Sequence, residues 1–537
     1  MKIHWLPGAS ALAMIAAVPA LAQGINRSQI EQSGTDGFAS VMQGGSESRS
    51  EVRQDGTNNR ATVKQTGPLQ ESEVVQRDDF NPAVDDNEAF VTQSGSENTQ
   101  SIRQVNSLSL ATVTQSGTLN DSEVFQGGER NTAEVNQSGE DDGSILNQLG
   151  DRNTATVEQS GERESSNLLQ SSADNQALVR QNGIENVSLL EQNGDGGHNA
   201  NVLQEGRNNL SDIIQNGSGS RTGEAAGSIG VTQLGEYDLA TVRQEGASHS
   251  ATVRQEGGEL NTASVEQYYP DADNNTADLR QNGSENRAVA NQRGFNHSAS
   301  TMQVGDRNQA EVFQYDAQGL NQTGSISQTG DFNTGGIAQA GEFQQGIIVQ
   351  EGDGNGADVD QRRERLAGAA GLTDSEFGRN QIGSITQRGN ANTASTLQSG
   401  ANQRAVIEQI GNDNGLPGVS ERGAEIIQGG DGDSGNDAGI TQLSDGNRAL
   451  IDQQGSSLTA MVEQSGNGGN TSIVMQSGNG SGVAINANVL QSGEQNLSEI
   501  IQTGTGHSAA VTQSSDLNTS SISQSGSGNI AMVTQGS

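Results

Sequence analysis

The sequence predicts an all-β chain in which strand–turn–strand units stack into a β-solenoid with a cross-β-like core. Three observations predict it: glutamine recurs mostly every eleven residues, Val, Ile or Leu often stands two positions before it, and glycine often stands two positions after it. A short fixed period is typical of repeat architectures, in which a unit buries its apolar face only by stacking on its neighbours. About 42 such glutamines predict about 21 coils of roughly 22 residues, each made of two eleven-residue half-repeats.

Residues 1–22 precede the repeats and have the features of a secretory signal peptide. Lys2 is followed by an apolar run over 11–18, and Ala20-Leu21-Ala22 provides a small-residue cleavage site. The run is too short for a membrane-spanning helix, and no other stretch approaches that length. We therefore expect an exported chain that consists of the repeat region, residues 23–537.

The segment Asn153 to Gln159 shows what each repeat encodes. Side chains alternate between the two faces of a strand, so one face carries four residues and the opposite face three. The core face is predicted to be Asn153, Ala155, Val157 and Gln159, and the outer face Thr154, Thr156 and Glu158. Gly161, two residues after the glutamine, is expected to supply the positive φ of a tight turn.

Seven strand residues and four turn residues make half a coil, and stacking at about 4.8 Å would place identical positions above one another. Val, Ile and Leu would then form apolar columns. Asn and Gln amides could bond to the copies above and below, which satisfies buried polar groups. The residues expected in this core ladder are Asn131, Ala133, Val135, Gln137, Asn153, Ala155, Val157, Gln159, Asn308, Ala310, Val312, Gln314, Asn529, Ala531, Val533 and Gln535.

Longer intervals between the glutamines predict loop insertions in the repeat region. They fall at 77–87, 216–227, 268–275, 315–322, 362–380 and 412–423. Most follow every fourth glutamine, so we expect them on one edge of the solenoid. That edge could recognise a partner or simply tolerate insertion. The longest insertion, which contains Arg362, Arg363 and Arg365, could bind an acidic partner or form a solvated loop.

The composition narrows the possible functions. The chain has 66 acidic against 28 basic residues and a net charge of −38, which argues against nucleic acid as a partner. It contains no cysteine, so disulfides do not hold it together. A polar chain rich in Gly, Ser, Asn and Gln could also be disordered. Disorder, however, does not require an apolar residue two positions before nearly every periodic glutamine.

We find no pattern that predicts an enzyme or a cofactor. The histidines after the signal segment lie in or near turns and lack the spacing of metal ligands or of a catalytic triad; they are His198, His249, His297 and His507. The acidic turn from Asp353 to Asp358 is similar to a single calcium-binding nonapeptide, or it is a solvated turn. We predict no catalytic, cofactor-binding or metal site.

The spacing Gln-x-Gly-x-x-Asn-x-Ala-x-x-x-Gln, found for example at 148–159, resembles the curlin repeat of bacterial curli, the extracellular functional amyloid of biofilms. The resemblance extends over nearly all of 23–537. It implies a β-solenoid subunit that passes through the periplasm and a dedicated outer-membrane export pore. It also implies a fibrous homopolymer at the cell surface, started by a nucleator subunit and supporting adhesion, as a pilus-like biofilm component.

Two other functions compete with fibre formation. A soluble solenoid with capped ends could act as an adhesin or binding rod that uses the insert-bearing edge. An ice-binding solenoid would need a flat array of outward threonines, whereas the outer positions here mix Arg, Glu, Thr and apolar residues. Solenoids that stay monomeric need atypical terminal repeats. The segments Asn518 to Gln524 and Asn529 to Gln535 are regular repeats, which favours self-association.

Overall fold

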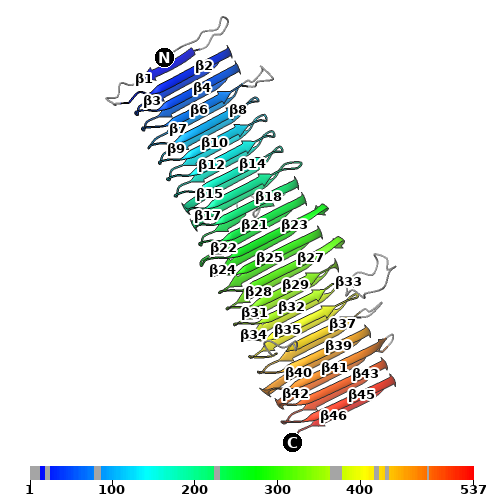
Figure 1. Cartoon of the computed structure of the whole chain (residues 1–537). Coiled ribbons are helices and arrows are strands. Elements are labelled where there is room, and N and C mark those ends of the chain that lie inside the picture. Colours follow the sequence, from blue (N-terminus) through cyan, green and yellow to red (C-terminus); the bar gives the residue numbers. More distant parts are fainter. Residues whose placement is uncertain are drawn as a thin grey trace, which may run out of the picture. The chain divides into compact units, whose positions relative to one another are not determined.

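The computed structural model describes residues 12–17, 24–77, 86–219, 221–222, 230–362, 378–415, 423–429, 435–479 and 483–536. The chain divides into two compact units, Met1–Leu260 (unit 1) and Asn261–Ser537 (unit 2). Among the described residues all regular elements are β-strands. Each unit is a β-solenoid of two parallel sheets, which confirms the predicted fold class (Figure 1).

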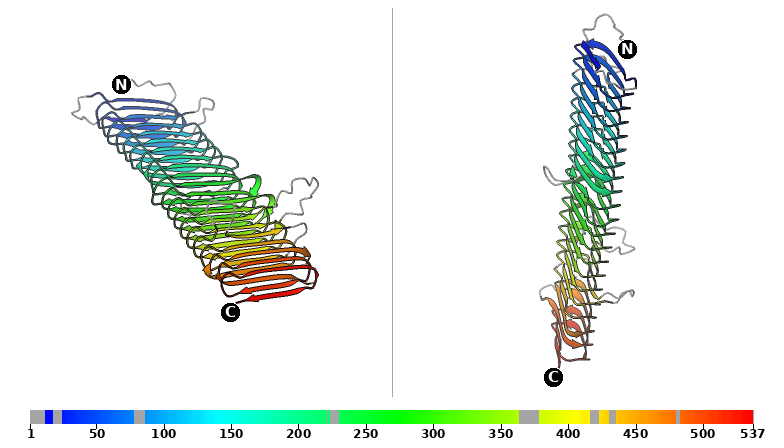
Figure 2. Two further views of the ribbon diagram at one scale, coloured as in Figure 1. Left: turned by 60° about the horizontal axis from the view of Figure 1, so that its bottom comes forward. Right: turned by 90° about the vertical axis from the view of Figure 1, so that its left-hand side faces the viewer.

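Unit 1 alternates along the chain between two sheets, here called A and B (Figure 2). Its described residues form about ten coils, in agreement with the predicted 22-residue coil of two eleven-residue half-repeats. Sheet A of this unit consists of β1 (Leu12–Ala17), β3 (Phe38–Gln43), β5 (Arg60–Gln65), β7 (Glu88–Gln93), β9 (Leu110–Gln115), β11 (Thr132–Gln137), β13 (Thr154–Gln159), β15 (Gln176–Ile184), β17 (Asn199–Arg207), β19 (Arg221–Thr222), β20 (Val231–Gln233) and β22 (Ser250–Glu256). Sheet B consists of β2 (Arg27–Thr35), β4 (Arg49–Thr57), β6 (Glu71–Gln76), β8 (Thr99–Gln104), β10 (Asp121–Gln126), β12 (Gly143–Gln148), β14 (Ser165–Gln170), β16 (Val187–Gln192), β18 (Leu210–Ser218) and β21 (Leu239–Ala247).

Unit 2 repeats this organisation in about eleven coils of described residues. Its sheet A consists of β24 (Thr276–Asn282), β26 (Ser298–Val304), β28 (Thr323–Thr329), β31 (Gln345–Glu351), β34 (Ile382–Arg388), β36 (Arg404–Ile410), β38 (Asp437–Gln442), β40 (Leu458–Gly468), β42 (Ile485–Glu494), β44 (Ser508–Gln513) and β46 (Ile530–Gln535). Its sheet B consists of β23 (Thr262–Asp273), β25 (Arg287–Phe295), β27 (Gln309–Leu320), β29 (Thr334–Gln339), β32 (Gly356–Gln361), β35 (Thr393–Gln398), β37 (Ala424–Gly429), β39 (Arg448–Ser456), β41 (Thr471–Asn479), β43 (Leu497–Thr505) and β45 (Thr519–Ser527). Two short strands, β30 (Gly341–Glu342) and β33 (Gly378–Arg379), pair separately.

The strands pair in parallel and in register, so equivalent residues of successive coils lie beside one another. Strand β11 pairs with β13 with Val135 opposite Val157 and Gln137 opposite Gln159. The offset is one 22-residue coil, because the chain makes a sheet B strand between two sheet A strands. Parallel pairing of this kind stacks like on like, which is the condition for continuous side-chain ladders.

The two sheets of each unit bury their facing side chains against each other. In β13 burial alternates strictly, with Ala155, Val157 and Gln159 buried and the residues between them facing outward. In unit 2, glycine replaces the inward alanine of the motif at some positions that face an isoleucine of the other sheet. A Cβ on Gly346, for example, would lie 2.7 Å from Ile337 Cγ2. A larger residue on one sheet is therefore offset by a smaller one on the other, which keeps the core close-packed.

The positive φ expected two residues after the glutamine is found in other copies of the motif, such as Gly206 at φ 105° and Gly217 at φ 108°, but not at Gly161. The residue of that turn with left-handed backbone is Arg163, at φ 55°. Gly161 is required for a different reason: a Cβ there would lie 2.1 Å from the carbonyl oxygen of Gly183 in the next coil. The backbones of stacked turns thus approach so closely that no side chain fits between them. The N–H of Arg163 donates to Glu140 O at 2.8 Å, which holds the strained residue in place.

Five of the six predicted insertions follow sheet B strands of their unit, namely β6, β18, β23, β27 and β32, and the sixth follows β36 of sheet A. Four of the insertions lie largely outside the described residues. The parts not described are 78–85, 223–229, 363–377 and 416–422. Residues 268–273 and 315–320, expected as loops, continue strands β23 and β27 instead. Stacked aromatic and cationic groups accompany these extensions, since Arg293 lies 4.2 Å from the ring centre of Tyr268 and 5.3 Å from that of Tyr315.

Candidate functional site

The glutamine side chains of each unit form two continuous hydrogen-bonded ladders in the space between the sheets, one along sheet A and one along sheet B. Gln137 Nε2 donates to Gln159 Oε1 at 3.0 Å, and Gln159 Nε2 donates to Gln181 Oε1 at 2.9 Å. The same Nε2 of Gln159 also donates to the carbonyl oxygen of Gly143 in the opposite sheet, at 2.9 Å. Each amide therefore joins its own coil to the next and joins sheet A to sheet B.

In unit 2 the ladders have the same geometry. Gln292 Nε2 donates to Gln314 Oε1 at 2.9 Å, and Gln314 Nε2 donates to Gln339 Oε1 at 2.9 Å and to Ser298 O at 3.0 Å. Gln314 is fully buried. Because a buried amide without partners is costly, the ladder is stable only when each coil has a neighbour of the same kind.

Asparagines that directly precede many of the strands form a second kind of ladder. The backbone N–H of Asn153 donates to Asn131 Oδ1 at 2.9 Å, and Asn131 Nδ2 donates to Gly150 O at 2.7 Å. Asn308 repeats both bonds, accepting from the N–H of Asn333 at 2.9 Å and donating to Gly330 O at 2.7 Å. The asparagine oxygen thus fixes the next coil, while its amide nitrogen fixes the glycine of the turn.

The structure places most of the sequence-predicted core residues in these ladders. Twelve of the sixteen are at most 1 % exposed: Asn131, Ala133, Val135, Gln137, Asn153, Ala155, Val157, Gln159, Asn308, Ala310, Val312 and Gln314. The remaining four lie on or next to β46, where Asn529 is exposed and Ala531, Val533 and Gln535 are half-buried. Gln535 still accepts from Gln513 Nε2 at 2.8 Å, so the ladder reaches this coil.

The four histidines beyond the signal segment occupy asparagine positions of the ladder, which the sequence analysis missed. His198, His249, His297 and His507 are each at most 1 % exposed. A signal for this placement exists in the sequence, because each histidine stands six residues before a periodic glutamine, as the asparagine does. Imidazole can replace the amide because its two ring nitrogens supply one donor and one acceptor.

His297 shows the replacement most fully. Its Nε2–H donates to Arg293 O at 3.0 Å, and its Nδ1 accepts from the backbone N–H of Gln322 at 3.3 Å. Burial lowers the pKa of His297 from 6.5 to about 4, against an opposing effect of the bond to Arg293. The neutral ring is therefore the form that fits, since a protonated Nδ1 could not accept the Gln322 N–H.

We expect His297→Asn to make unit 2 less sensitive to acid. The wild-type ring, with a lowered pKa in the folded state, contributes stability above pH 6.5 that is lost as pH falls towards 4. At pH 4.5 the variant should exceed the wild type in unfolding free energy by about 2–3 kcal/mol, and at pH 7.5 the two should be similar. Urea unfolding at both pH values measures this, and an unchanged difference between them would contradict it.

Three buried carboxylic acids of unit 1 also occupy asparagine positions: Asp238, and the pair Asp142 and Glu164 in neighbouring coils. Asp142 and Glu164 are each 1 % exposed. Burial raises the pKa of Asp142 from 3.8 to about 6 and that of Glu164 from 4.5 to about 7. Like the histidines, both stand six residues before a periodic glutamine.

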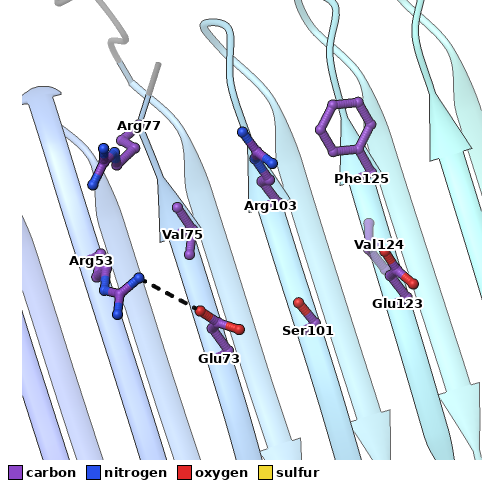
Figure 3. Close-up of a pocket in the computed structure, with 9 residues that line it drawn as sticks. All are labelled: Arg53, Glu73, Val75, Arg77, Ser101, Arg103, Glu123, Val124 and Phe125. Carbon is purple, nitrogen blue, oxygen red and sulfur yellow. Dashed lines mark ion pairs between the residues drawn. The ribbon is translucent and has the colours of Figure 1, made fainter. Parts of the chain in front are cut away.

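The outer surface of sheet B in unit 1 carries a shallow hollow over β4, β6, β8 and β10 (Figure 3). Arg53 lies 4.0 Å from Glu73 and 3.9 Å from Glu31, and Arg103 lies over the ring of Phe125 at 5.7 Å. The residues that line the hollow are Arg53, Glu73, Val75, Arg77, Ser101, Arg103, Glu123, Val124 and Phe125. Opposite charges already neutralise one another here, which is typical of a solvated sheet face.

The acidic turns stabilise the stack directly. Asp331 Oδ1 accepts from the N–H of Asp306 at 2.8 Å, and Asp353 Oδ1 accepts from the N–H of Asp331 at 2.8 Å. In the described part of the chain no group of three His, Asp or Glu residues is placed to hold a metal ion. The carboxylate of Asp353, considered above as a calcium ligand, is thus a link between the turns of successive coils.

Comparison with known protein families gives one match, which is distributed along both units. The family is described as the curlin associated repeat, and it matches residues 109–139, 128–161, 272–300, 383–416, 434–466 and 484–514. No significant match was found among curated proteins. In the described residues, no helix has the length and apolar character needed to cross a membrane.

Proposed function

The chain belongs to the curlin-repeat family, and on this premise we propose that it is an extracellular structural protein whose copies join end to end into fibres. Curlin repeats mark a family of curli-type amyloid and biofilm proteins. The proposal places the mature chain outside the cell, after removal of residues 1–22, as a contributor to biofilm matrix and adhesion. Export through an outer-membrane pore and the action of a nucleator subunit belong to the same proposal. It includes no catalytic step.

The observation that carries the proposal is the ladder itself. Most of the described inner glutamines donate at least one bond within their coil and one to the glutamine of the next coil, as Gln513 does to Leu497 O at 3.1 Å and to Gln535 Oε1 at 2.8 Å. Gln535 donates to Thr519 O at 2.9 Å, the equivalent of the bond within the coil. A coil from a second copy would supply the equivalent of the bond between coils.

The coil of β45 and β46 also exposes apolar surface that inner coils cover. The inward-facing Val533 is half-buried, whereas Val511, its partner in the neighbouring coil, is 1 % exposed. An exposed strand edge with free backbone groups is a template for another strand of the same kind. Covering Val533 with the equivalent valine of another copy would continue the apolar column.

Removal of the signal segment would expose an edge in unit 1 as well. Strand β1 (Leu12–Ala17), within the signal segment, pairs in parallel with β3, with Ile15 opposite Val41 and Ala17 opposite Gln43. Cleavage after residue 22 would take β1 away and leave this edge of β3 available. The proposal therefore predicts that the uncleaved chain assembles more slowly than the mature chain.

The proposal is tested by following purified 23–537 over time. We expect it to sediment as fibres that bind amyloid dyes, and preformed fibres should shorten the lag phase when they are added as seeds. The full chain 1–537 is the matched control and should show a longer lag. A mature chain that stays a folded monomer for days at high concentration would contradict the proposal and support the soluble adhesin.

A further inference from the structure

The asparagine ladder of unit 1 contains a pair of buried acids that cannot make the bonds of the residues they replace when they are ionised. In the preceding coil Asn120 uses both ends of its amide: Oδ1 accepts from the N–H of Asp142 at 3.0 Å, and Nδ2 donates to Gly139 O at 3.2 Å. Asp142 reproduces the first of these bonds, since its Oδ1 accepts from the N–H of Glu164 at 3.1 Å. It does not reproduce the second, because an ionised carboxylate has no hydrogen to donate.

The second oxygen of each acid makes no hydrogen bond. Asp142 Oδ2 stands where Asn120 has its donating nitrogen, and it is buried without a partner, as is Glu164 Oε2. Glu164 Oε1 accepts from Asn186 Nδ2 at 3.1 Å. In the asparagine ladder, Nδ2–H donates to the carbonyl oxygen of a turn glycine. An ionised carboxylate has no hydrogen to donate to that carbonyl oxygen. A protonated carboxyl group can donate to it, since its O–H replaces one N–H of the amide.

Among the residues that the structure describes around the pair, no cation compensates the two charges. The pair is enclosed along the column by the neutral Asn120 and Asn186, and Asp141 in the same turn adds negative charge. Arg163 adjoins Glu164 in the chain, but its exposed guanidinium pairs with Glu162 and, at 2.9 Å, with Glu185. Two like charges in adjacent coils and out of water strongly favour uptake of protons.

We propose that Asp142 and Glu164 form a proton-binding site that controls the stability of the coils around β11 to β14. When both carboxyl groups are protonated, their O–H groups complete the side-chain ladder towards the turn glycines. When both are ionised, the coils hold two buried, repelling charges and open more readily. This inference concerns the folded unit alone and does not depend on fibre formation.

The direction of the pH effect follows from the pKa values. Burial raises both pKa values in the folded state, to about 6 for Asp142 and about 7 for Glu164. Nearby backbone N–H groups, including that of Glu164 beside Asp142, act in the opposite direction and are outweighed. The stabilisation is therefore complete below about pH 4 and is lost as pH rises through about 6 to 7.

The test is hydrogen exchange of the unassembled mature chain between pH 4 and 7.5, corrected for the intrinsic exchange rate at each pH. We expect protection of β11 to β14 to fall as pH rises in the wild type. The double variant Asp142→Asn/Glu164→Gln should keep high protection at pH 7.5 and lose the pH dependence. Because the substitutions restore neutral amides, the variant should fold; Asp142→Asn alone serves as a milder version.

The matched control is Glu140→Gln/Asp141→Asn, which removes the same charge from two exposed side chains of the same turn. It should keep the wild-type loss of protection, with a small shift caused by the missing Asp141 charge. Equal pH dependence in the wild type and the Asp142→Asn/Glu164→Gln variant would overturn the proposal. A second outcome would also overturn it: if added calcium at pH 7.5 raised the protection of the wild type but not of that variant, the pair would be a cation site.

Discussion

Gln159→Glu is expected to destabilise unit 1 by about 3–5 kcal/mol at pH 7.5, the cost of leaving a buried charge without compensation. Gln159 is 1 % exposed, and its Nε2 donates to both Gln181 Oε1 and Gly143 O. Glutamate has nearly the same shape but loses both donated bonds and faces two oxygens. Urea unfolding of the mature chain before assembly measures the loss, and fibre formation should slow in parallel.

Gln176→Glu is the matched control, because it makes the same chemical change on the outer face of the next coil. Gln176 is exposed, and its side chain only accepts a long bond from Asn199 Nδ2 at 3.4 Å. The expected change in unfolding free energy is within about 0.5 kcal/mol. If both variants lost the same stability, the glutamine ladder would not be what holds the coils together.

Val157→Asp should be at least as damaging as Gln159→Glu. Val157 is fully buried in the apolar column, next to Val135 and Val179 of the neighbouring coils. An aspartate there has no partner in the column, so we expect a loss of about 3–5 kcal/mol or failure to fold at neutral pH. Circular dichroism shows whether the chain folds, and urea unfolding measures the loss where it does.

Thr156→Asp provides the comparison for the opposite face of the same strand. Thr156 faces outward and lies between Glu134 and Leu178 of the neighbouring coils. An added charge there meets water and one like charge, which costs below about 1 kcal/mol. A Thr156→Asp chain as unstable as Val157→Asp would mean that the two faces of β13 are assigned wrongly.

The fold could be predicted because its determinants are local and repeated. The eleven-residue period places an inward glutamine in nearly every strand of the two sheets, and the alternation in segments such as Asn153 to Gln159 defines which side chains face the core. Parallel stacking in register then follows, because only that arrangement brings equal residues together, as Val135 and Val157 show. Errors at single positions are averaged over many copies of the motif.

The remaining features depend on contacts between coils, which the motif of one coil does not contain. Gly161 was expected to be needed for its backbone angle, whereas the oxygen of Gly183 in the next coil leaves no space for a side chain. The roles of His297 and Asp142 do not follow from residue type, because their position in the repeat is what places them in the ladder. Both stand six residues before a glutamine, where the ladder requires a donor and an acceptor.

Diffraction from aligned fibres of the mature chain tests end-to-end assembly most directly. If copies extend one another's ladders, strands lie across the fibre, and a sharp reflection at about 4.7–4.8 Å must lie along the fibre axis. A weaker reflection near 10 Å, from the spacing of sheets A and B, is expected perpendicular to it. Fibres whose 4.7–4.8 Å reflection lies across the axis would show that copies associate side by side, and the account of self-templating coils would be wrong.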